Sequence, residues 1–424
     1  MRYVSTAGTA PAVGFSAAMT AGLAPDGGLY VPEEFPRVDP GELTELALPV
    51  LARSLLEPFL VDDPLAAQLE KICVAAFDFP IPAVSVDGHL VLELFNGPTC
   101  AFKDVGARFF AECMSAAGGQ RRVLVATSGD TGGAVAAACH GKPGLDVTIL
   151  YPHRGVSPRQ EHQLTCWGGN VEALAVRGVF DDCQRLVKQA FSPGNWPERG
   201  LTTANSINIA RLLPQIVHHA VGALAALNTF GEPVDTVIPS GNLGNATAAL
   251  WAKRMGLPIG RIVLATNANR TISEFFSSGR LECRPSVSTL ANAMDVGDPS
   301  NLERVRHLYA DHAALCDSVS AVAVEDEAIE RAIVHTYRKT GRMVDPHTAT
   351  AYAAHSTLPA QPRVLVSTAH PAKFPEVVEP LVGTPIEIPT HLADLLNRPA
   401  RVREMDANID ALKASIARLE GRGL

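Results

Sequence analysis

Several features that mark whole classes of protein are missing from this chain of 424 residues. No run of Lys or Arg stands out and the net charge is −8, so the basic surface that nucleic-acid binding needs is not expected. No apolar run reaches the roughly 18 residues of a membrane span, and the first residues lack the charged and apolar regions of a signal peptide. The sequence therefore predicts a cytoplasmic protein without nucleic-acid or membrane partners.

Sequence patterns for a bound metal are missing as well. None of the eight cysteines forms a C-x-x-C pair, and no H-E-x-x-H occurs. Most cysteines stand singly in apolar segments, as expected of free, buried thiols in a reducing compartment. With 47% hydrophobic and 19% charged residues, the chain has enough apolar material for two or three packed domains. We therefore expect no catalytic or structural metal.

From about residue 90 onward, short apolar runs alternate with helical patterns. Strands are predicted over residues 90–95, 123–127, 147–151, 171–176, 235–239, 261–266 and 363–368. Helices are predicted over residues 180–191, 207–227, 245–255 and 325–340. Such alternation predicts an α/β fold with mostly parallel sheets covered on both faces.

The two ends of the chain differ from this pattern. Residues 1–88 are rich in Pro, Gly and short apolar runs, which predicts a separate N-terminal domain with helices near 41–56 and 63–76. Residues 391–424 show helical spacing and are expected to form a C-terminal helical segment. The α/β part is divided in this interpretation into one domain over 89–215 and another over 216–390.

A glycine-rich loop, Ser240-Gly-Asn-Leu-Gly-Asn245, separates a predicted strand from a predicted helix. Glycines free backbone N–H groups at a helix N-terminus, where they can bind a phosphate dianion. A tight turn that binds nothing is the alternative for a lone G-x-x-G. The loop has neither the G-x-G-x-x-G of dinucleotide sites nor the G-K-[ST] of triphosphate sites. A monophosphate is therefore the expected ligand.

A second polar loop, Thr127-Ser-Gly-Asp-Thr-Gly-Gly133, also lies between a strand and a helix. It brings hydroxyl groups and a carboxylate to the carboxyl end of a strand, the edge at which open α/β sheets bind ligands. Taken alone, the loop is equally consistent with a helix capped by Ser128 or Asp130. Two such loops in one chain favour a ligand-binding cleft.

Lys103 follows a Gly-Pro turn and has apolar neighbours such as Phe102. Apolar surroundings lower the pKa of a lysine ammonium group, which favours a nucleophilic amine. A surface lysine beside Asp104 is the alternative. Thr368 follows the last predicted strand, where its hydroxyl can face a ligand or cap the next turn. A reactive lysine, a monophosphate site and a hydroxyl-rich loop are together what pyridoxal phosphate requires.

Taken together, these segments resemble the threonine synthase family of fold-type II pyridoxal-phosphate enzymes. The matching motifs occur in the family order over nearly the whole chain. They are Asp26-Gly-Gly-Leu-Tyr-Val-Pro32, Gly97-Pro-Thr-Cys-Ala-Phe-Lys-Asp104, Thr127-Ser-Gly-Asp-Thr-Gly132, Phe180-Asp-Asp-Cys183, Asn205-Ser-Ile-Asn-Ile-Ala-Arg211, Gly241-Asn-Leu-Gly-Asn245, Asp345-Pro-His-Thr348 and Thr368-Ala-His-Pro-Ala-Lys-Phe374.

The resemblance implies two open α/β domains with the active site between them, and the conversion of O-phosphohomoserine and water to threonine and phosphate. It implies that Lys103 forms the Schiff base with pyridoxal phosphate and moves the Cα proton of the substrate. The implied cofactor-binding residues are Lys103, Asp130, Gly241, Asn242, Leu243, Gly244, Asn245 and Thr368. The implied substrate-binding residues are Thr127, Thr131, Asn205, Ser206 and Arg211. A monomer is expected, as in similar enzymes.

Other activities on the same scaffold stay open from the sequence. One is a phospho-lyase or dehydratase that releases a 2-oxo acid, and another is a pathway-specific paralogue with an altered substrate. A non-enzymatic relative is disfavoured because Lys103 and both polar loops are retained.

Overall fold

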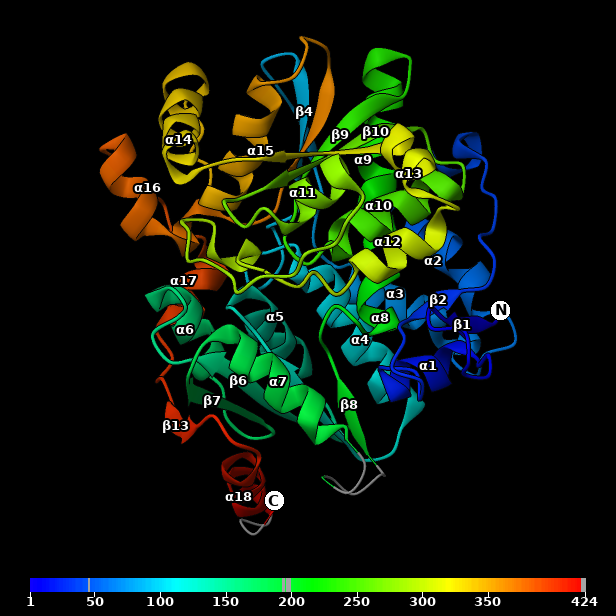
Figure 1. Cartoon of the computed structure of the whole chain (residues 1–424), viewed down its shortest axis with the longest axis vertical. Coiled ribbons are helices and arrows are strands. Elements are labelled where there is room, and N and C mark those ends of the chain that lie inside the picture. Colours follow the sequence, from blue (N-terminus) through cyan, green and yellow to red (C-terminus); the bar gives the residue numbers. More distant parts are fainter. Residues whose placement is uncertain (45, 193–194, 196–199, 421–424) are drawn as a thin grey trace.

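The computed structural model describes residues 1–44, 46–192, 195 and 200–420, and it is built on two open sheets (Figure 1). Across the larger sheet the strands are β11 (Val319–Ala323), β10 (Ile259–Thr266), β9 (Val234–Pro239), β12 (Arg363–Ser367), β4 (His89–Glu93) and β3 (Ala83–Val86). Its strands pair in parallel except for β3, which is antiparallel to β4. The prediction of a mostly parallel α/β fold is confirmed.

The smaller sheet forms the lower half of the molecule in Figure 1. Its strands, in order, are β13 (Arg403–Asp406), β7 (Val171–Arg177), β6 (Leu145–Pro152), β5 (Arg121–Ala126) and β8 (Leu201–Thr203). All four pairings between them are parallel. The strands predicted near 90–95, 123–127, 147–151, 171–176, 235–239, 261–266 and 363–368 therefore all exist, with shifted ends.

Both faces of each sheet are buried, because neighbouring residues of a strand enter different apolar clusters. Along β5, Val123 and Val125 belong to one cluster and Leu124 and Ala126 to another. This is the two-residue period of a strand packed on both sides. The first cluster includes α5 (Asp130–Cys139), which packs on α4 (Lys103–Ala117), and the second includes α7 (Phe180–Ala190) and α18 (Ile409–Glu420).

The larger sheet is covered in the same way. The helices α9 (Gln215–Phe230) and α10 (Gly244–Arg254) contribute to the cluster on one face. The helices α14 (Asp326–Thr340) and α15 (Pro346–Ser356) contribute to the cluster on the other. Both arrangements place the carboxyl ends of the strands toward the space between the two sheets, where the predicted loops lie.

The N-terminal residues pack beside both halves and close one side of the molecule in Figure 1. They form β1 (Tyr3–Ser5), α1 (Phe15–Ala21), β2 (Tyr30–Pro32), η1 (Pro40–Leu43), α2 (Leu48–Leu56), η2 (Glu57–Leu60), η3 (Ala66–Gln68) and α3 (Leu69–Ala76). The further short elements are α6 (Pro158–Thr165), α8 (Ile209–Leu212), α11 (Thr271–Ser278), η4 (Asn292–Met294), α12 (Leu302–Leu308), α13 (His312–Ser318), η5 (Pro371–Lys373), α16 (Pro375–Val382) and α17 (Thr390–Leu396).

Four predicted helical segments are wrong in detail. The helix predicted over 207–227 is divided into α8 and α9, with Pro214 between them, because proline has no backbone N–H to continue a helix. The helices predicted near 41–56 and 63–76 each begin with a separate 3₁₀ turn, η1 and η3. The C-terminal segment is not purely helical, since it contains β13 between α17 and α18; residues 421–424 of that segment lie outside the described part.

The sheets do not follow the predicted domain boundaries. Strand β4, which the sequence interpretation assigned to a domain over 89–215, pairs with β12 of the larger sheet. Strand β13, assigned to a separate C-terminal segment, pairs with β7 of the smaller sheet. Local sequence pattern carries no information on which distant strand a segment joins. The limits of the folding units themselves stay a prediction.

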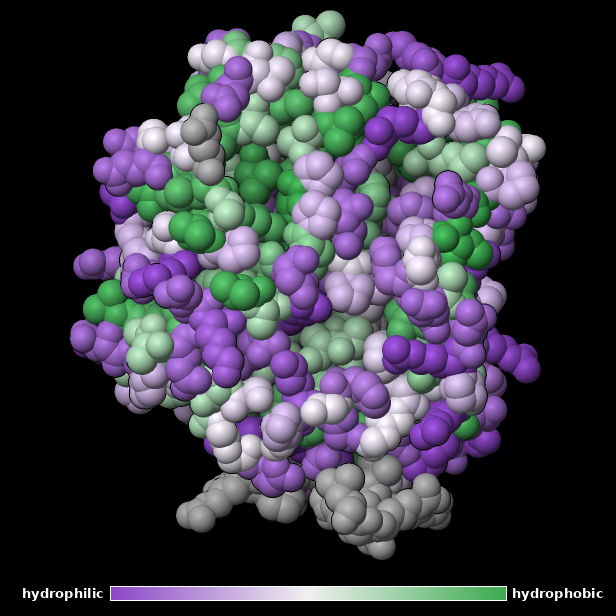
Figure 2. Space-filling view, turned by 180° about the vertical axis from the view of Figure 1, so that it is seen from behind, coloured by the Kyte–Doolittle hydropathy of each residue, from purple (hydrophilic) through white to green (hydrophobic). Residues whose placement is uncertain are grey.

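Most of the cysteines match the sequence expectation of free, buried thiols. Within the described residues, no helix is long and apolar enough to cross a membrane. Figure 2 shows hydrophilic residues over most of the lower half and apolar residues gathered over part of the upper half. All eight cysteines are free and six of them are buried; Cys283 is exposed and Cys316 is partly exposed, contrary to the expectation of buried thiols.

Candidate active site

Every residue predicted for the site lines one cavity between the two sheets. They are Lys103, Thr127, Asp130, Thr131, Asn205, Ser206, Arg211, Gly241, Asn242, Leu243, Gly244, Asn245 and Thr368. The segments that carry them follow β5 and β8 in the smaller sheet and β4, β9 and β12 in the larger one. The cavity thus lies at the carboxyl ends of parallel strands, the usual ligand-binding edge of open α/β sheets.

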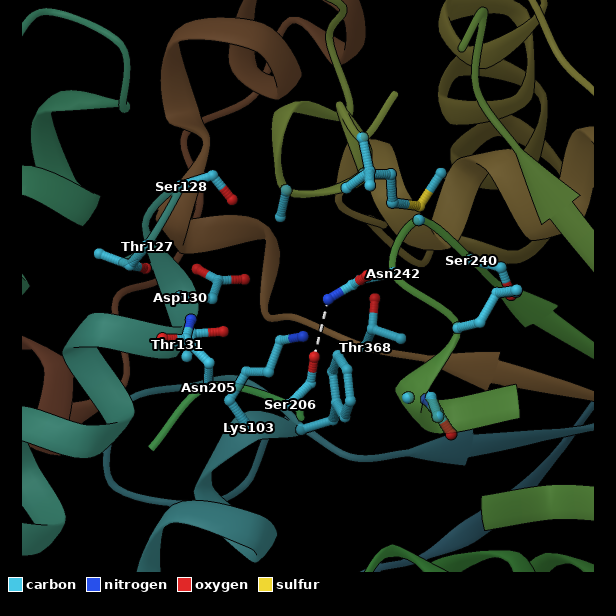
Figure 3. A pocket seen from close by; sticks show the side chains of 18 of the residues that line it. Lys103, Thr127, Ser128, Asp130, Thr131, Asn205, Ser206, Ser240, Asn242 and Thr368 are labelled. Atoms are coloured by element: carbon cyan, nitrogen blue, oxygen red, sulfur yellow. Dashed lines mark hydrogen bonds between the residues drawn. The ribbon is translucent and has the colours of Figure 1, made fainter. Parts of the chain in front are cut away.

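Lys103 is the first residue of α4, and its side chain points into this cavity (Figure 3). Its Nζ lies 4.2 Å from the centre of the Phe102 ring, and the described residues give it no hydrogen bond or ion pair. Burial and the nearby positive charge of Arg211 lower the pKa of Lys103 to about 8, against a smaller opposite effect of Asp130. Lys103 is therefore an unpaired amine with a substantial neutral fraction near neutral pH.

The backbone holds Lys103 next to Thr368. Ala101 and Ala369 form an antiparallel bridge, and the N–H of Phe102 donates to the carbonyl of Thr368 over 2.8 Å. Cys100 bends the chain into this bridge with a φ of 58°. Residues other than Gly, Asn and Asp seldom adopt this left-handed conformation. Two segments more than 250 residues apart in sequence thus meet at the base of the cavity.

Asp130 faces the same cavity and is held by a buried ion pair. Lys373, whose side chain is fully buried, lies 2.9 Å from Asp130 and donates to the carbonyl of Thr99 over 2.8 Å. The amide of Gln160 also donates to Asp130, over 3.0 Å. Burial is the largest single effect and raises the pKa of this carboxyl, but Lys373, His347 and the hydrogen bond from Gln160 together outweigh it and lower the pKa of Asp130 to about 2. Asp130 is therefore a fixed anion.

The hydroxyl-rich loop is closed by Thr127 and not by the residues predicted as caps. The Thr127 hydroxyl oxygen accepts from the N–H groups of Gly129, over 3.0 Å, and Gly132, over 2.9 Å. The N-cap of α5 is Gly129, so neither Ser128 nor Asp130 caps the helix. Gly129 has a φ of 129°, and a Cβ there would lie 2.6 Å from the side chain of Gln160. The turn leaves Asp130 and Thr131 facing the cavity.

The loop over residues 240–245 forms a cup at the N-terminus of α10. Leu243 precedes the helix with a φ of 59°, and a Cβ on Gly241 would lie 2.7 Å from the Cα of Met294. Asn242 donates to the Ser206 hydroxyl over 2.8 Å and accepts from the N–H of Ser300 over 2.6 Å. The cup is therefore fixed by its contacts and presents backbone N–H groups together with a positive helix end.

The segment over residues 205–211 forms the wall next to the cup, since Ser206 accepts the hydrogen bond from Asn242. Asn205 pairs through both sides of its amide with the backbone of Ala126, at 3.1 and 2.6 Å, so it shapes the loop. Arg211 is buried and donates to the carbonyl of Ala204, while its Nε has no hydrogen-bond partner. Burial lowers the pKa of Arg211 to about 10. The arginine stays protonated, so one donor is left without an acceptor.

Several residues that line the cavity were not predicted as site residues. His347 belongs to a quoted motif: its Nδ1 lies 2.8 Å from Asp345, and its Nε2 accepts from the N–H of Ala293 over 3.0 Å. Phe180 also belongs to a quoted motif, which could have signalled its place. Ser128 and Ser240 lie in the two polar loops singled out in the sequence. Nothing in the sequence pattern marks other lining residues such as Gln184, Gln215, Ala246 and Met294.

The residues present fit pyridoxal phosphate. Three residues that line the cavity have a buried polar atom without a partner: Asn245 Nδ2, Arg211 Nε and Gln215 Oε1. Buried polar atoms are rarely left unpaired, so their grouping indicates a polar ligand. The cup suits a monophosphate, and the unpaired amine of Lys103 suits an aldehyde.

Comparisons with known proteins agree with this geometry. The family model "Threonine synthase N terminus" matches residues 2–77, "Pyridoxal-phosphate dependent enzyme" matches residues 80–367, and "Threonine synthase, C-terminal" matches residues 347–416. Threonine synthase of Escherichia coli (strain K12) is 39% identical over 410 residues, which cover 95% of this chain and 96% of the relative. That of Pseudomonas aeruginosa is 36% identical over 472 aligned positions, covering 100% of this chain and 99% of the relative.

Solved structures show the same similarity over the whole fold. The crystal structure of threonine synthase from Escherichia coli has a TM-score of 0.93 and 37% identity, and covers 99% of this chain and 100% of that one. The structure of PLP-bound threonine synthase from Brucella melitensis has a TM-score of 0.90 and 34% identity, with 99% of both chains covered. This chain belongs to the threonine synthase family of pyridoxal-phosphate-dependent enzymes.

Proposed function

We propose that this protein converts O-phospho-L-homoserine and water into L-threonine and phosphate, with pyridoxal phosphate as its cofactor. The observation that carries the proposal is the unpaired amine of Lys103, which shares one cavity with an anion-binding cup and with Arg211. A phosphorylated cofactor and a phosphorylated substrate require two separate anion sites, and the cavity offers the cup and the unpaired guanidinium donor of Arg211.

The cofactor would be held by Lys103 and by residues on three sides of it. Gly241, Asn242, Leu243, Gly244 and Asn245 would hold its phosphate through the cup. Thr368 would offer its hydroxyl to the ring nitrogen, and Asp130, kept ionised by Lys373, would face the ring as a fixed charge. When bound, pyridoxal phosphate supplies an electron sink that acidifies the Cα–H bond of an amino acid.

Lys103 has a second role in this proposal, as the base that takes the proton from Cα of the substrate. A general base works best when its pKa lies near the working pH, and the lowered pKa of about 8 meets this condition. The same amine, or another base in the cavity, would then take the Cβ proton, whose removal lets phosphate leave from Cγ. A proton returned to Cγ completes the methyl group, water then adds its hydroxyl group at Cβ, and a proton returned to Cα completes threonine.

The substrate phosphate and carboxylate would be held by Thr127, Thr131, Asn205, Ser206 and Arg211. Arg211 supports this with an unpaired, charged donor, because a guanidinium binds phosphate oxygens in a fork and opposes charge that develops on the leaving group. Thr131 has no side-chain hydrogen bond among the described residues. Asn205 and Thr127 already bind backbone groups, so their part is mainly to shape the wall.

We further propose that the protein acts as a monomer in the cytoplasm. Every residue of the proposed site comes from a single chain, so a partner subunit is not needed to complete it. The free cysteines agree with a reducing compartment. Sedimentation of the purified protein over a range of concentrations tests the first point.

The assay uses purified full-length protein with added pyridoxal phosphate and O-phosphohomoserine. Threonine and phosphate released in equal amounts support the proposal. 2-Oxobutyrate as the main product contradicts it and favours the phospho-lyase or dehydratase alternative. Lys103→Ala is expected to abolish turnover, while Lys71→Ala, a change of an exposed lysine, is the matched control and keeps it.

A further inference from the structure

Two adjacent histidines of α9, His218 and His219, lie directly behind the cup. Both are buried, with 0% and 2% of their surface exposed, and neither was expected at the site. The Nε2 of His218 is 3.1 Å from Oδ1 of Asn245, and the Nε2 of His219 is 2.6 Å from the same atom. The Nε2 of His219 also lies 3.0 Å from the backbone carbonyl oxygen of Asn245. Both rings therefore converge on one residue of the cup.

The backbone carbonyl fixes the direction of these hydrogen bonds. A carbonyl oxygen only accepts, so Nε2 of His219 must carry a hydrogen. The side-chain atom of Asn245 that faces this N–H must then be the amide oxygen and not the amide nitrogen. The Nε2 of His218, which meets the same oxygen, must be a donor for the same reason. Two N–H groups thus determine which way the Asn245 amide is turned.

Both rings are neutral donors in this position. Burial lowers the pKa of His219 to about 4, and burial together with the neighbouring ring lowers the pKa of His218 well below its ordinary value. The Nδ1 of His218 has no hydrogen-bond partner, as expected of a ring whose hydrogen is on Nε2. The pair can therefore orient Asn245 without placing a positive charge behind the cup.

With its oxygen turned toward the histidines, Asn245 directs its amide nitrogen the other way. That nitrogen is buried and has no hydrogen-bond partner, and Asn245 lines the cavity as the second residue of α10. An unpaired buried N–H₂ group at the positive end of a helix needs an acceptor, and a phosphate oxygen is suited to it. If the amide were reversed, its oxygen would face the phosphate and repel it.

We propose that His218 and His219 are positioning residues for the phosphate of the cofactor, acting by locking the Asn245 amide with its N–H₂ group toward the cup. The inference rests on the proposed function, because the phosphate in question is that of pyridoxal phosphate. Neither histidine touches the ligand; each acts through Asn245. Simple packing of the two helices would need rings of this size but no N–H group at Nε2.

The test compares two ligands that differ only in the phosphate. Full-length protein freed of cofactor is titrated with pyridoxal phosphate and with pyridoxal. His219→Phe keeps an aromatic ring and removes the donor, so it should weaken binding of pyridoxal phosphate about tenfold and leave pyridoxal unchanged. His219→Gln keeps a donor and should recover most of the loss. In an Asn245→Ala background, His219→Phe should have no further effect.

The outcomes separate this inference from the proposed function. Equal weakening for both ligands, or an undiminished effect of His219→Phe in the Asn245→Ala background, overturns the positioning role. Wild-type protein that binds pyridoxal phosphate no better than pyridoxal overturns the proposed cofactor itself. If His219→Phe does not fold, ¹⁵N NMR of the wild-type imidazoles decides: hydrogen on Nε2 of both rings supports the inference, and hydrogen on Nδ1 of His219 refutes it.

Discussion

The lowered pKa of Lys103 predicts an unusual reactivity before any cofactor is bound. At a pKa of about 8, roughly a quarter of the Lys103 amines are neutral at pH 7.5. At the ordinary value of 10.5, only about one in a thousand would be neutral. Because only the neutral amine is a nucleophile, Lys103 should react with a small acylating reagent on the order of a hundredfold faster than an ordinary lysine of equal accessibility.

The assay is competitive acetylation of cofactor-free protein between pH 6 and pH 11. Acetylation of Lys103 is followed by peptide mass spectrometry, and Nα-acetyl-lysine, whose side-chain amine is free, is the internal standard. The Lys103 curve should have its midpoint about pH 8. Arg211→Met removes a cation that lowers the pKa and should shift the midpoint up, while Asp130→Asn removes an anion that raises it and should shift the midpoint down. A midpoint near that of the standard, or shifts of both variants in one direction, refutes the reasoning.

Three further changes test the framework of the site. Lys373→Met leaves the Asp130 carboxylate buried without its partner, so it should lower the free energy of unfolding, measured by urea denaturation, by about 3 kcal/mol. The double variant with Asp130→Asn should recover part of this lost stability. Arg304→Met removes the donors for three backbone carbonyls, so it should lower the free energy of unfolding by about 3 kcal/mol or more. Arg306→Met, at an exposed position of the same helix, should change the free energy of unfolding little. Gly241→Ala forces a Cβ against the backbone of Met294 in η4. It should weaken pyridoxal phosphate binding at least tenfold, measured by titration of cofactor-free protein.

The alternation of strands and helices was predictable because it depends on local periodicity. The centres of runs such as 123–127 and 363–368, which are Val123–Ala126 and Val364–Val366, are apolar, and a strand buried on both faces needs this composition. The break at Pro214 was missed although the residue is visible in the sequence, since the helical pattern continues on both sides of it. The strand β13 was missed because four residues of mixed polarity at a sheet edge carry almost no signal.

The candidate site was predicted where it lies in loops with unusual composition. Glycines, hydroxyls and a lysine close to strand ends stand out against an apolar background, so Lys103 and the cup could be named. His218 and His219 could not, because two polar residues inside an apolar helix have no meaning until α10 is packed against it. Lys373 likewise acquires its role only from a contact with Asp130, which is more than 240 residues away in sequence.

The place of β12 in the larger sheet has a consequence for synthesis of the chain. β12 lies between β9 and β4, so these two strands have no partner to join them until residues 363–367 have left the ribosome. The residue that follows β12 is Thr368, which meets the backbone beside Lys103. Closing the central gap of the sheet and assembling the binding site are therefore one late event. A nascent or truncated chain that ends before β12 leaves one open edge on each of two apolar strands, β9 and β4, and it should depend on chaperones more than its many local helices suggest.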